Sequence, residues 1–323
     1  MDITTTYLGM ELKTPLVVSA SPFSKKIDNI KRLEDAGASA IVFNSLFEEQ
    51  IRLEKEKKFL ISIARNTSEK FIHQVKSSPT DYLEKIRKAK EVVNIPIIAS
   101  LNGFSQGPWT EYAQLIEESG ADALELCLYH IAADKYCSSQ ETEISYLQLI
   151  ESIRNQISIP LAVKLSPFFS NIANMAQRIV KKGAEALVLF NRFYQPDIDL
   201  TKKKMVPNVL LSSPSDMRLP MRWIAILKDR IDCDFAASSG ISSGNDVIKM
   251  TMVGADISMV CSALLKNGIS HLSIMEQEVK NWMEKYEYPS LTSIKGCISS
   301  FNVTDPGAYE RLWYIKAIND YKI

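Results

Sequence analysis

The 323-residue sequence has few cysteines and no excess of either charge, and these absences exclude several classes of protein. Its five cysteines are scattered, odd in number and without a Cys-x-x-Cys pair, which argues against a disulfide framework, a zinc site or an iron–sulfur cluster. Lys and Arg together number 38, as do Asp and Glu, so no net field recruits nucleic acid or an anionic membrane. We therefore expect reduced thiols, no metal and no nucleic-acid partner.

Long apolar runs and a dinucleotide-binding fingerprint are also missing. No window approaches the roughly eighteen apolar residues of a membrane span, so we expect no membrane partner. The opening residues, MDITTTYLGM, lack the basic and apolar regions of a signal peptide, which favours a cytoplasmic protein. No Gly-x-Gly-x-x-Gly motif is present, which argues against an open dinucleotide-binding sheet. The length and the 46% apolar composition suit one large soluble domain.

An internal repeat is the strongest positive feature. The same pattern occurs four times: a Gly-Ala pair, then two or three residues, then an apolar strand. The four copies begin at Gly37, Gly120, Gly183 and Gly254. Each Gly-Ala comes after a helical pattern, so the glycine is expected just beyond a helix, where positive φ is needed. Four further strands begin near Pro15, Asn94, Ser158 and Cys233. Eight strands alternating with helices predict an α/β fold with a parallel sheet, a (β/α)8 TIM barrel rather than a doubly wound sheet.

One domain is expected over residues 1–323, with the barrel at roughly 15–285. The segment TTYLGMELKTP is predicted to form an N-terminal hairpin that closes the barrel floor. Residues 194–217 are too many for a simple loop, and residues 286–323 are predicted to form a partly helical C-terminal tail. No low-complexity linker marks a second domain.

Active sites of such barrels lie where the strands end, and Lys164 is placed there. Alternation along residues 161–166 turns Leu161, Val163 and Leu165 towards the helices and Lys164 into the barrel mouth. A buried ammonium needs an anionic or hydrogen-bonding partner. Two compatible interpretations remain, an internal ion pair with Glu125 and a cation beside a cofactor that becomes anionic.

Small polar residues at most strand ends predict a flat polar ligand lying over the barrel. They are Ser21, Asn44, Ser45, Ser100, Asn102, Cys127 and Asn191. The last two strands end in the turns Ser239-Gly240-Ile241 and Cys261-Ser262, whose backbone N–H groups predict a phosphate site. Two ordinary βα turns are the alternative interpretation.

At these residues the chain resembles the dihydroorotate dehydrogenase family over nearly its whole length. The matching stretches are LGMELKTPLVVSASPF, IPIIASLNG, GADALEL, IPLAVKLSP and SSGISSGNDVIKMTMVGADISMVCSALLKNG. The resemblance implies FMN over Ala20, Ser21, Ser45, Ser100, Lys164, Asn191, Gly240 and the Cys261-Ser262 turn, with Asn44, Asn102, Cys127, Ser239 and Ile241 around them. It places Lys164 beside flavin N1 and looks like the soluble class, whose members are homodimers.

The resemblance is weaker at the residues that contact the substrate in the family. Asn44 replaces a family lysine, Arg192 replaces a small hydroxyl residue, and the family's Asn-Leu-Ser-Cys-Pro-Asn reads CLYHIA from Cys127. The family's substrate loop, Asn-x-Met-Gly-Leu-Pro-Asn, has no counterpart between residues 60 and 80. The altered loop and the segment LFNRFYQPDID resemble a divergent bacterial branch of the family.

The resemblance predicts an FMN-dependent oxidoreductase that converts dihydroorotate to orotate in pyrimidine biosynthesis. The alternatives are the same chemistry on another substrate, an FMN-binding paralogue without catalysis, and a phosphate-ligand lyase or isomerase on the same barrel.

For the catalytic base we predict His130, at the position of the family cysteine, because an imidazole with a pKa of about 6.5 suits base work near neutrality. The same loop also offers Tyr129, and Cys137 is the second choice if residues 129–142 fold as a lid.

Overall fold

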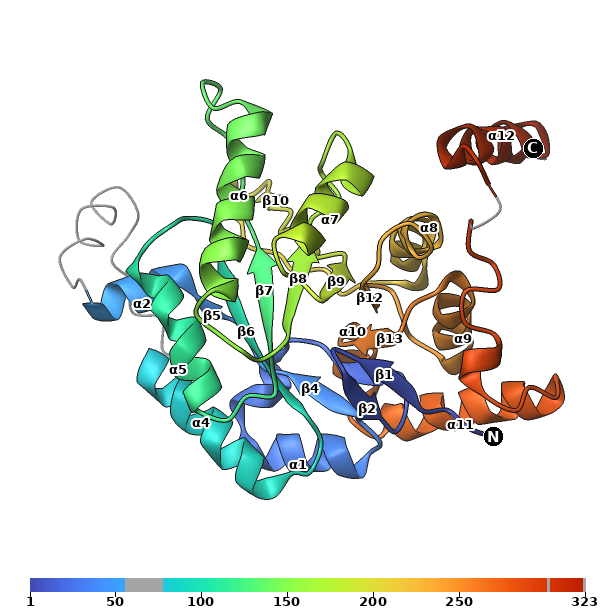
Figure 1. Ribbon diagram of the computed structural model, residues 1–323, viewed down its shortest axis with the longest axis horizontal. Coiled ribbons are helices and arrows are strands. Elements are labelled where there is room, and N and C mark those ends of the chain that lie inside the picture. The colour runs from blue at the N-terminus through green and yellow to red at the C-terminus, as the bar shows by residue number, and fades with distance from the viewer. Residues whose placement is uncertain (56–77, 301–302, 322–323) are drawn as a thin grey trace.

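The computed structural model describes residues 1–55, 78–300 and 303–321, and a closed barrel of eight parallel strands forms its core (Figure 1). In chain order the barrel strands are β3 (Leu16–Val18), β4 (Ala40–Val42), β6 (Ile97–Gly103), β7 (Ala123–Leu128), β8 (Leu161–Leu165), β9 (Ala186–Leu189), β12 (Asp234–Ser238) and β13 (Ile257–Val260). Each pairs in parallel with the next, and Ser258 on β13 pairs with Leu16 on β3 to close the ring. The short β5 (Leu46–Phe47) adds to β6. The predicted (β/α)8 barrel is confirmed.

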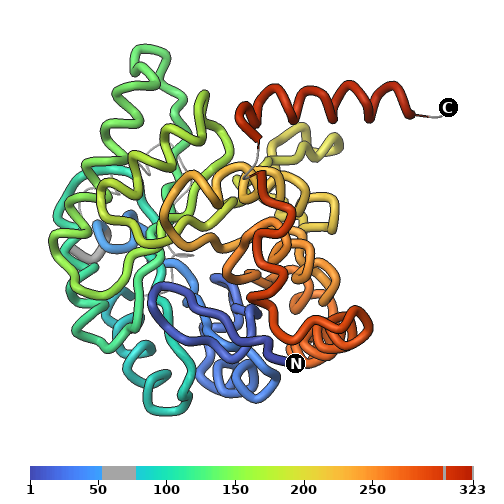
Figure 2. Tube along the Cα trace, turned by 45° about the vertical axis from the view of Figure 1, so that its right-hand side comes forward, coloured from blue at the N-terminus to red at the C-terminus, as the bar shows by residue number. Residues whose placement is uncertain are grey.

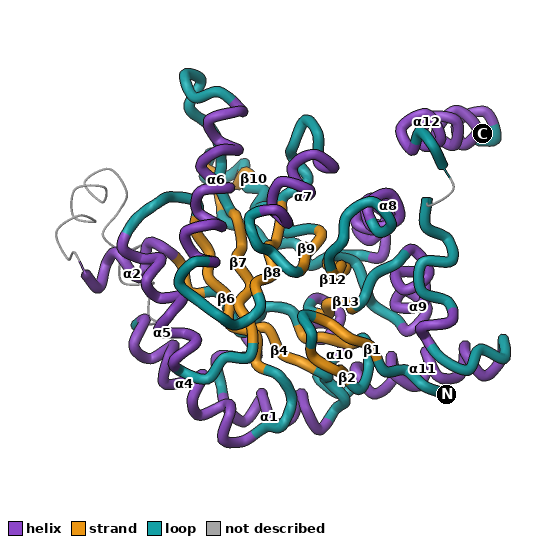
Figure 3. The backbone as a smooth tube through the Cα atoms, viewed as in Figure 1, coloured by secondary structure: helices purple, strands orange, loops and turns teal. Residues whose placement is uncertain are grey.

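Helices surround the strands on the outside of the barrel (Figure 3). They are α1 (Ile27–Asp35), α2 (Glu48–Lys55), α4 (Pro79–Val92), α5 (Tyr112–Glu118), α6 (Ser139–Arg154), α7 (Ile172–Lys181), α8 (Arg218–Leu227), α9 (Gly244–Val253), α10 (Ser262–Asn267) and α11 (His271–Lys285). Short 3-10 helices occur at η1 (Pro22–Lys25), η3 (Pro108–Glu111), η4 (Pro214–Met217) and η5 (Leu291–Ser293). Among the described helices, none is long and apolar enough to cross a bilayer.

The pleat of the strands divides the core into two layers. On β8, Leu161, Val163 and Leu165 pack in the layer between strands and helices, whereas Ala162 packs inside the barrel. Small residues recur on the inner side, where the strands converge; they include Ala40, Ala123, Ala186 and Ala236. The alternation predicted for residues 161–166 is therefore confirmed, and it turns Lys164 inward.

The predicted floor hairpin is present as β1 (Thr5–Tyr7) and β2 (Met10–Leu12). Tyr7 is fully buried and belongs with Leu12 to the inner layer of the barrel. The Leu8 N–H donates to the Asp234 carboxylate at 2.6 Å, which ties the turn of the hairpin to the first residue of β12. The hairpin thus closes the barrel opposite the mouth.

The glycines of the Gly-Ala repeat all have positive φ, as the sequence predicts. They are Gly37, Gly120, Gly183 and Gly254, with φ between 88° and 110°. At Gly254, directly after α9, an added Cβ would also meet the Lys228 side chain. Each repeat therefore marks the turn from a helix back into a strand.

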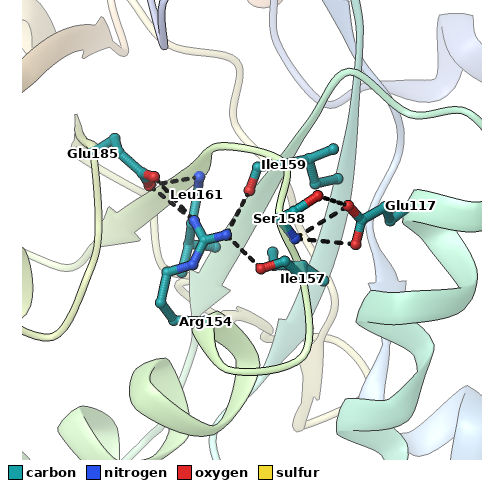
Figure 4. A network of polar contacts seen from close by, with 7 residues as sticks. All are labelled: Glu117, Arg154, Ile157, Ser158, Ile159, Leu161 and Glu185. Atoms are coloured by element: carbon teal, nitrogen blue, oxygen red, sulfur yellow. Dashed lines mark hydrogen bonds and ion pairs between the residues drawn. The ribbon is translucent and has the colours of Figure 1, made fainter.

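A polar network fixes the turn between α6 and β8 (Figure 4). The Arg154 guanidinium donates to Glu185 at 3.0 and 3.2 Å and to two main-chain carbonyls of the turn. Glu185 also accepts from the Leu161 N–H at 2.8 Å. On the other side, the Ser158 N–H donates to Glu117 at 3.1 Å. These bonds set where β8 begins, and so the height of Lys164 in the barrel.

Two segments extend beyond the barrel. The long connection after β9 contains an antiparallel hairpin, β10 (Asp197–Asp199) with β11 (Lys204–Val206), beside the barrel mouth. In the tail, Leu291 and Ile294 are buried against the body, whereas α12 (Pro306–Asn319) stands away from it (Figure 2). The predicted C-terminal helix is confirmed.

Candidate functional site

A buried lysine–glutamate pair lies at the centre of the barrel mouth. The Lys164 ammonium on β8 is 3.4 Å from Glu125 Oε1 on β7 and 3.4 Å from the Ser19 hydroxyl after β3. The two charged side chains are only 7% and 1% exposed. Glu125 Oε2 is buried without a partner among the described residues. The internal ion pair expected from the sequence is therefore present, and Lys164 also borders the cavities above it.

The larger mouth cavity has a volume of about 480 Å³, within the range of small-molecule sites. Six residues predicted to bind a cofactor line it: Ala20, Ser45, Asn102, Cys127, Lys164 and Asn191. The segment after β9 forms its roof, where the Arg192 guanidinium donates to the Leu210 carbonyl at 3.0 Å. A flat ligand would be enclosed between the strand ends and this roof.

The smaller cavity, of about 160 Å³, follows β12 and β13 and contains the predicted phosphate turns. Its lining includes Ser239, Gly240, Ile241, Cys261 and Ser262. Within the described chain, no acceptor contacts the backbone N–H groups of Gly240, Ile241, Ser262 or Ala263. These donors suit an anion, because each N–H needs an acceptor that the protein does not supply.

Two features shape this anion cradle, which consists of the turns Ser239-Gly240-Ile241 and Cys261-Ser262. Gly240 has a φ of 77°, and a Cβ there would lie 2.7 Å from the Ser213 carbonyl oxygen and closer still to the Met217 nitrogen. The Ser262 hydroxyl accepts from the Ser212 N–H at 3.0 Å, which leaves its own proton free for a ligand. The turn after β12 is therefore closely packed from behind.

The two cavities share a border. Ala20, Lys164, Asn191 and Arg192 line both. A ligand with a flat polar part and a terminal anion can therefore extend through both and pass the Lys164 ammonium on the way. The two cavities lie at the strand ends, where the sequence predicted a flat polar ligand and a phosphate.

Cys127 and Asn191 form a polar contact on the cavity wall. The Asn191 side-chain amide donates to Cys127 Sγ at 3.1 Å. Burial raises the pKa of the Cys127 thiol to about 12, although the nearby Lys164 partly opposes that rise. Cys127 therefore remains a neutral thiol near pH 7 and does not serve as a base there.

His130, the predicted base, lies beside the larger cavity and does not line it. Its ring stacks on Phe104, with 4.5 Å between centroids, and meets Tyr146 edge-on at 6.0 Å. Its Nδ1 is buried without a partner among the described residues. Burial also lowers the pKa of the imidazole. In this conformation its surroundings are mainly aromatic.

Tyr129 and Cys137, from the same loop, are placed differently. Cys137 is exposed, and its sulfur lies 3.5 Å from the Thr142 hydroxyl at the start of α6, away from both cavities. Tyr129 lines the larger cavity. Its hydroxyl accepts from the Tyr194 N–H at 2.8 Å, and its ring stacks on Phe193 at 4.2 Å. Of the three loop candidates, Tyr129 is the one at the cavity surface.

Three predicted cofactor residues lie outside the cavity walls. Ser100 is buried and its hydroxyl is 2.9 Å from that of Ser45, which does line the cavity. The Asn44 side chain accepts from Ser24 at 3.3 Å, and the Ser21 hydroxyl is buried without a described partner. The missing substrate loop between residues 60 and 80 falls, except for 78–80, outside the described residues.

The sequence did not indicate several residues of the site. They are Ser19, Phe47, Phe193–Gln195 and Asn208–Leu210. Ser19 directly follows β3, and alternation along that strand could have placed it inward with Val17. The roof residues lie in an irregular segment without periodicity, so only its length marked it as unusual.

The protein is a closed (β/α)8 barrel with a buried cation at its mouth, and the adjacent backbone N–H groups could hold a phosphate-bearing ligand. Among the described residues, no cluster of three His, Cys, Asp or Glu side chains could hold a metal ion.

Comparison with known proteins identifies the family. The dihydroorotate dehydrogenase family model matches residues 67–283, and the chain belongs to this family of FMN-binding oxidoreductases that act on CH–CH groups. The catalytic subunit of dihydroorotate dehydrogenase B (NAD(+)) of Thermoplasma volcanium is 26% identical over 303 residues, 91% of this chain and 98% of the relative. The same subunit of Methanocaldococcus jannaschii is 24% identical over 90% and 96% of the two chains. Dihydroorotate dehydrogenase A (fumarate) of Limosilactobacillus reuteri is 27% identical over 64% and 68%.

Proposed function

We propose that this chain binds FMN across the two mouth cavities and uses it to oxidise or reduce a carbon–carbon bond of a small substrate. The observation that carries this proposal is the continuous site that runs from the unpaired N–H groups at Gly240 and Ser262 to the Lys164 ammonium. Family membership supports the same cofactor.

The residues present fit FMN at both ends. The phosphate would be held by the N–H groups of Gly240, Ile241, Ser262 and Ala263, and by the free proton of the Ser262 hydroxyl. The flavin ring would lie against the small side chains of the strand ends, with Lys164 supplying positive charge. FMN, when bound, would supply the acceptor or donor of a hydride.

The protein's own residues would stabilise charge and move a proton. Lys164 is held in the mouth by Glu125 and Ser19, so its ammonium is preorganised to stabilise negative charge that develops on a bound group. Removal of a hydride from a CH–CH bond also releases a proton, which a side chain on the substrate side must accept. Cavity geometry favours Tyr129 over His130 and Cys137 for this role, in which the phenol would accept the substrate proton as its own hydroxyl proton passes to solvent.

Dihydroorotate is the substrate we propose first, converted to orotate in pyrimidine biosynthesis. The family and the similarity to enzymes named for this reaction support it. A different ring substrate is the second candidate, and the observation in its favour is the loop after β7, where His130 packs on Phe104 and Tyr129 borders the cavity. A paralogue that binds FMN without catalysis is the third.

One experiment tests these proposals in sequence. The purified protein is titrated with FMN and with FAD, in the absence and presence of inorganic phosphate as a competitor, and binding is followed by flavin fluorescence and visible absorbance. We expect one FMN per chain, and a colourless protein that FMN does not reconstitute would refute the cofactor. The loaded protein is then mixed anaerobically with dihydroorotate. Bleaching supports the first substrate, whereas bleaching by dithionite alone favours the second or third candidate.

Further features follow the resemblance. We propose that residues 1–323 form a single FMN-binding domain, that the protein is a cytoplasmic homodimer, and that it belongs to the divergent bacterial branch with the altered loop after β7. The segment LFNRFYQPDID, which forms much of the cavity roof, supports the last point.

A further inference from the structure

Arg192 lies where three cavities at the barrel mouth meet. Besides the two cavities described above, a third of about 180 Å³ lies between the loop after β8 and α8. Arg192 and its neighbour Asn191 line all three. The hydrogen bond from Arg192 Nη1 to the Leu210 carbonyl places the guanidinium. Because Leu210 lines the larger cavity and neither of the others, the guanidinium belongs to the roof of the larger cavity.

Arg192 is a cation of the mouth whose charge no acid of the described chain neutralises. Lys164, the other cation that lines these cavities, is paired with Glu125. Asp216, in the third cavity, accepts from the Ser213 N–H at 2.7 Å and from the Ser213 hydroxyl at 3.1 Å, and it forms no ion pair with Arg192. These acids therefore have other donors, and the guanidinium is left to bind an anion from outside the chain.

The free edge of the guanidinium suits a carboxylate. A guanidinium carries five N–H donors, and the bond to the roof carbonyl uses one of them. No described residue accepts from Nε or Nη2 of Arg192. Two parallel N–H groups on one edge match the two oxygens of a carboxylate, and such paired, charge-assisted bonds are stronger than neutral ones.

The phosphate of FMN has donors of its own in the anion cradle, so the anion at Arg192 belongs to another ligand. The cradle turns line the smaller cavity, whereas the guanidinium is held by the segment after β9 that covers the larger one. Tyr129 lies on the same side, because its hydroxyl accepts from the Tyr194 N–H of that segment. The proposed proton acceptor and Arg192 thus share the side that remains for a substrate once a flavin ring covers the strand ends.

The rest of this side is mainly apolar. The apolar and aromatic side chains that line the larger cavity besides Tyr129 are Phe47, Phe193, Tyr194, Val209 and Leu210. Val209 and Leu210 are 78% and 71% exposed, so a ligand that covers them removes apolar surface from water. Gln195 and Asn208 are the amides among them. A ring in this space would be held mainly by contact with its faces.

We propose that Arg192 is the specificity residue of this site, which binds the carboxylate of a small ring acid while apolar contacts hold the ring. This inference rests on the proposed flavin function and deepens it by naming the group that the substrate carries. The class includes dihydroorotate and also ring acids without polar groups on the ring, because recognition resides in the carboxylate. A neutral ring of the same shape leaves the guanidinium unpaired beneath the roof, so it binds more weakly.

Two matched pairs of ligands test the proposal. Orotate and uracil share a pyrimidine ring and differ in the carboxylate, and benzoate and benzamide share a benzene ring and differ in charge. Isothermal titration calorimetry of the full chain measures the four affinities. For the wild type we expect each acid to bind about tenfold more tightly than its neutral partner, or better, and benzoate to bind within about tenfold of orotate.

Three variants assign this preference to the guanidinium. Arg192→Gln should weaken both acids by about tenfold or more and leave uracil and benzamide unchanged. Arg192→Lys should restore only part of the loss, because an ammonium keeps the charge but not the paired donors. Lys202→Gln is the matched control. Lys202 is an exposed cation of the segment after β9, paired with Asp199 at 3.2 Å, and it lines none of the three cavities, so all four affinities should stay at the wild-type values.

Four results would overturn the proposal. Acids that bind no better than their neutral partners, or not at all at millimolar concentration, would remove the anion site, and a preference that survives Arg192→Gln would assign it elsewhere. Orotate that binds far more tightly than benzoate would show that the polar groups of the ring are recognised. An Arg192→Gln protein that loses FMN but keeps its preference for acids would assign Arg192 to the phosphate.

Failure of this inference and failure of the flavin site are distinguishable. Flavin content is read from the visible absorbance of the same samples, and calorimetry does not depend on colour. A colourless protein would refute the flavin function, while the four affinities would still decide the role of Arg192. A yellow protein without a preference for acids would refute the role of Arg192 alone.

Discussion

Lys164 and Glu125 form a buried ion pair between adjacent strands, and only one oxygen of the carboxylate is used. The ammonium is 3.4 Å from Oε1, while Oε2 has no described partner. A buried pair with incomplete hydrogen bonding is weak evidence for stability. We infer that the pair is retained because it holds a cation in the barrel mouth.

Removing only one member of this pair should destabilise the protein strongly. Lys164→Met leaves Glu125 buried and unpaired, so we expect its free energy of unfolding to fall by about 3–5 kcal/mol. The double variant Lys164→Met/Glu125→Gln should recover much of that loss, because no buried charge remains. Urea unfolding of the flavin-free proteins measures both. Equal stability of the single and double variants would show that the charges are not coupled.

The cradle glycine offers a second prediction. Gly240→Ala introduces a Cβ close to the Ser213 carbonyl at a φ of 77°, so it should cost about 1–2 kcal/mol for the left-handed backbone and more for the clash. Gly296→Ala is the control, because its φ of 73° is close to that of Gly240 but nothing lies within 4 Å of the added Cβ. Gly240→Ala should lower both the thermal unfolding temperature and the affinity for FMN more than the control variant does. Equal losses would mean that backbone strain alone accounts for the effect.

Much of the fold and half of the site could be predicted because they depend on regular local patterns. The Gly-Ala repeats marked the helix ends, and alternation placed Lys164 inside the barrel. The roof could not be predicted in this way, because Tyr194 and Leu210 are brought over the mouth by tertiary contacts such as that of Tyr129 with the Tyr194 N–H. The position of His130 also depends on such a contact, its stacking on Phe104, which no sequence spacing reveals.

The buried Cys127 thiol predicts a loss of stability in alkali. Burial raises its pKa to about 12, above the value of about 8.5 expected in the unfolded chain. Its contribution to stability is therefore complete below about pH 8.5 and is lost progressively as the pH rises towards 12. The free energy of unfolding should fall between pH 8.5 and 10.5, by at most about 1.4 kcal/mol per pH unit from this group.

Denaturant titrations of Cys127→Ala and of Cys297→Ser test this assignment. Cys297 is exposed, so its variant should keep the alkaline slope of the wild type, whereas Cys127→Ala should be flatter. A Cys127→Ala protein with the full wild-type slope would assign the alkaline loss to other buried groups. Cys233 is one such group, because burial raises its pKa to about 12 as well.

The last prediction concerns which residue of the loop after β7 moves the proton. Tyr129 lines the cavity, and its hydroxyl accepts a hydrogen bond from the Tyr194 N–H, so its own proton is free to pass to solvent as the oxygen takes up the proton of the substrate. His130 packs between Phe104 and Tyr146, and Cys137 lies on the exposed side of the loop. We expect Tyr129→Phe to slow anaerobic single-turnover flavin reduction by about 10²–10⁴-fold, the usual contribution of a general acid or base.

The pH dependence of the same reaction distinguishes Tyr129 from His130. Burial lowers the pKa of His130, so a His130 base would be neutral and active above a pKa below 6.5, and the rate would fall only on the acid side of that value. If His130 is the base, His130→Ala should therefore abolish the fall in rate at low pH. If Tyr129 is the base, His130→Ala should leave the pH profile unchanged. Cys137→Ser is the control for the loop. Flavin binding by Tyr129→Phe must equal that of the wild type, since the variant removes one hydroxyl and keeps the ring stacked on Phe193. A Tyr129→Phe protein with the wild-type rate, together with a His130→Ala protein that has lost its activity, would return the role to His130.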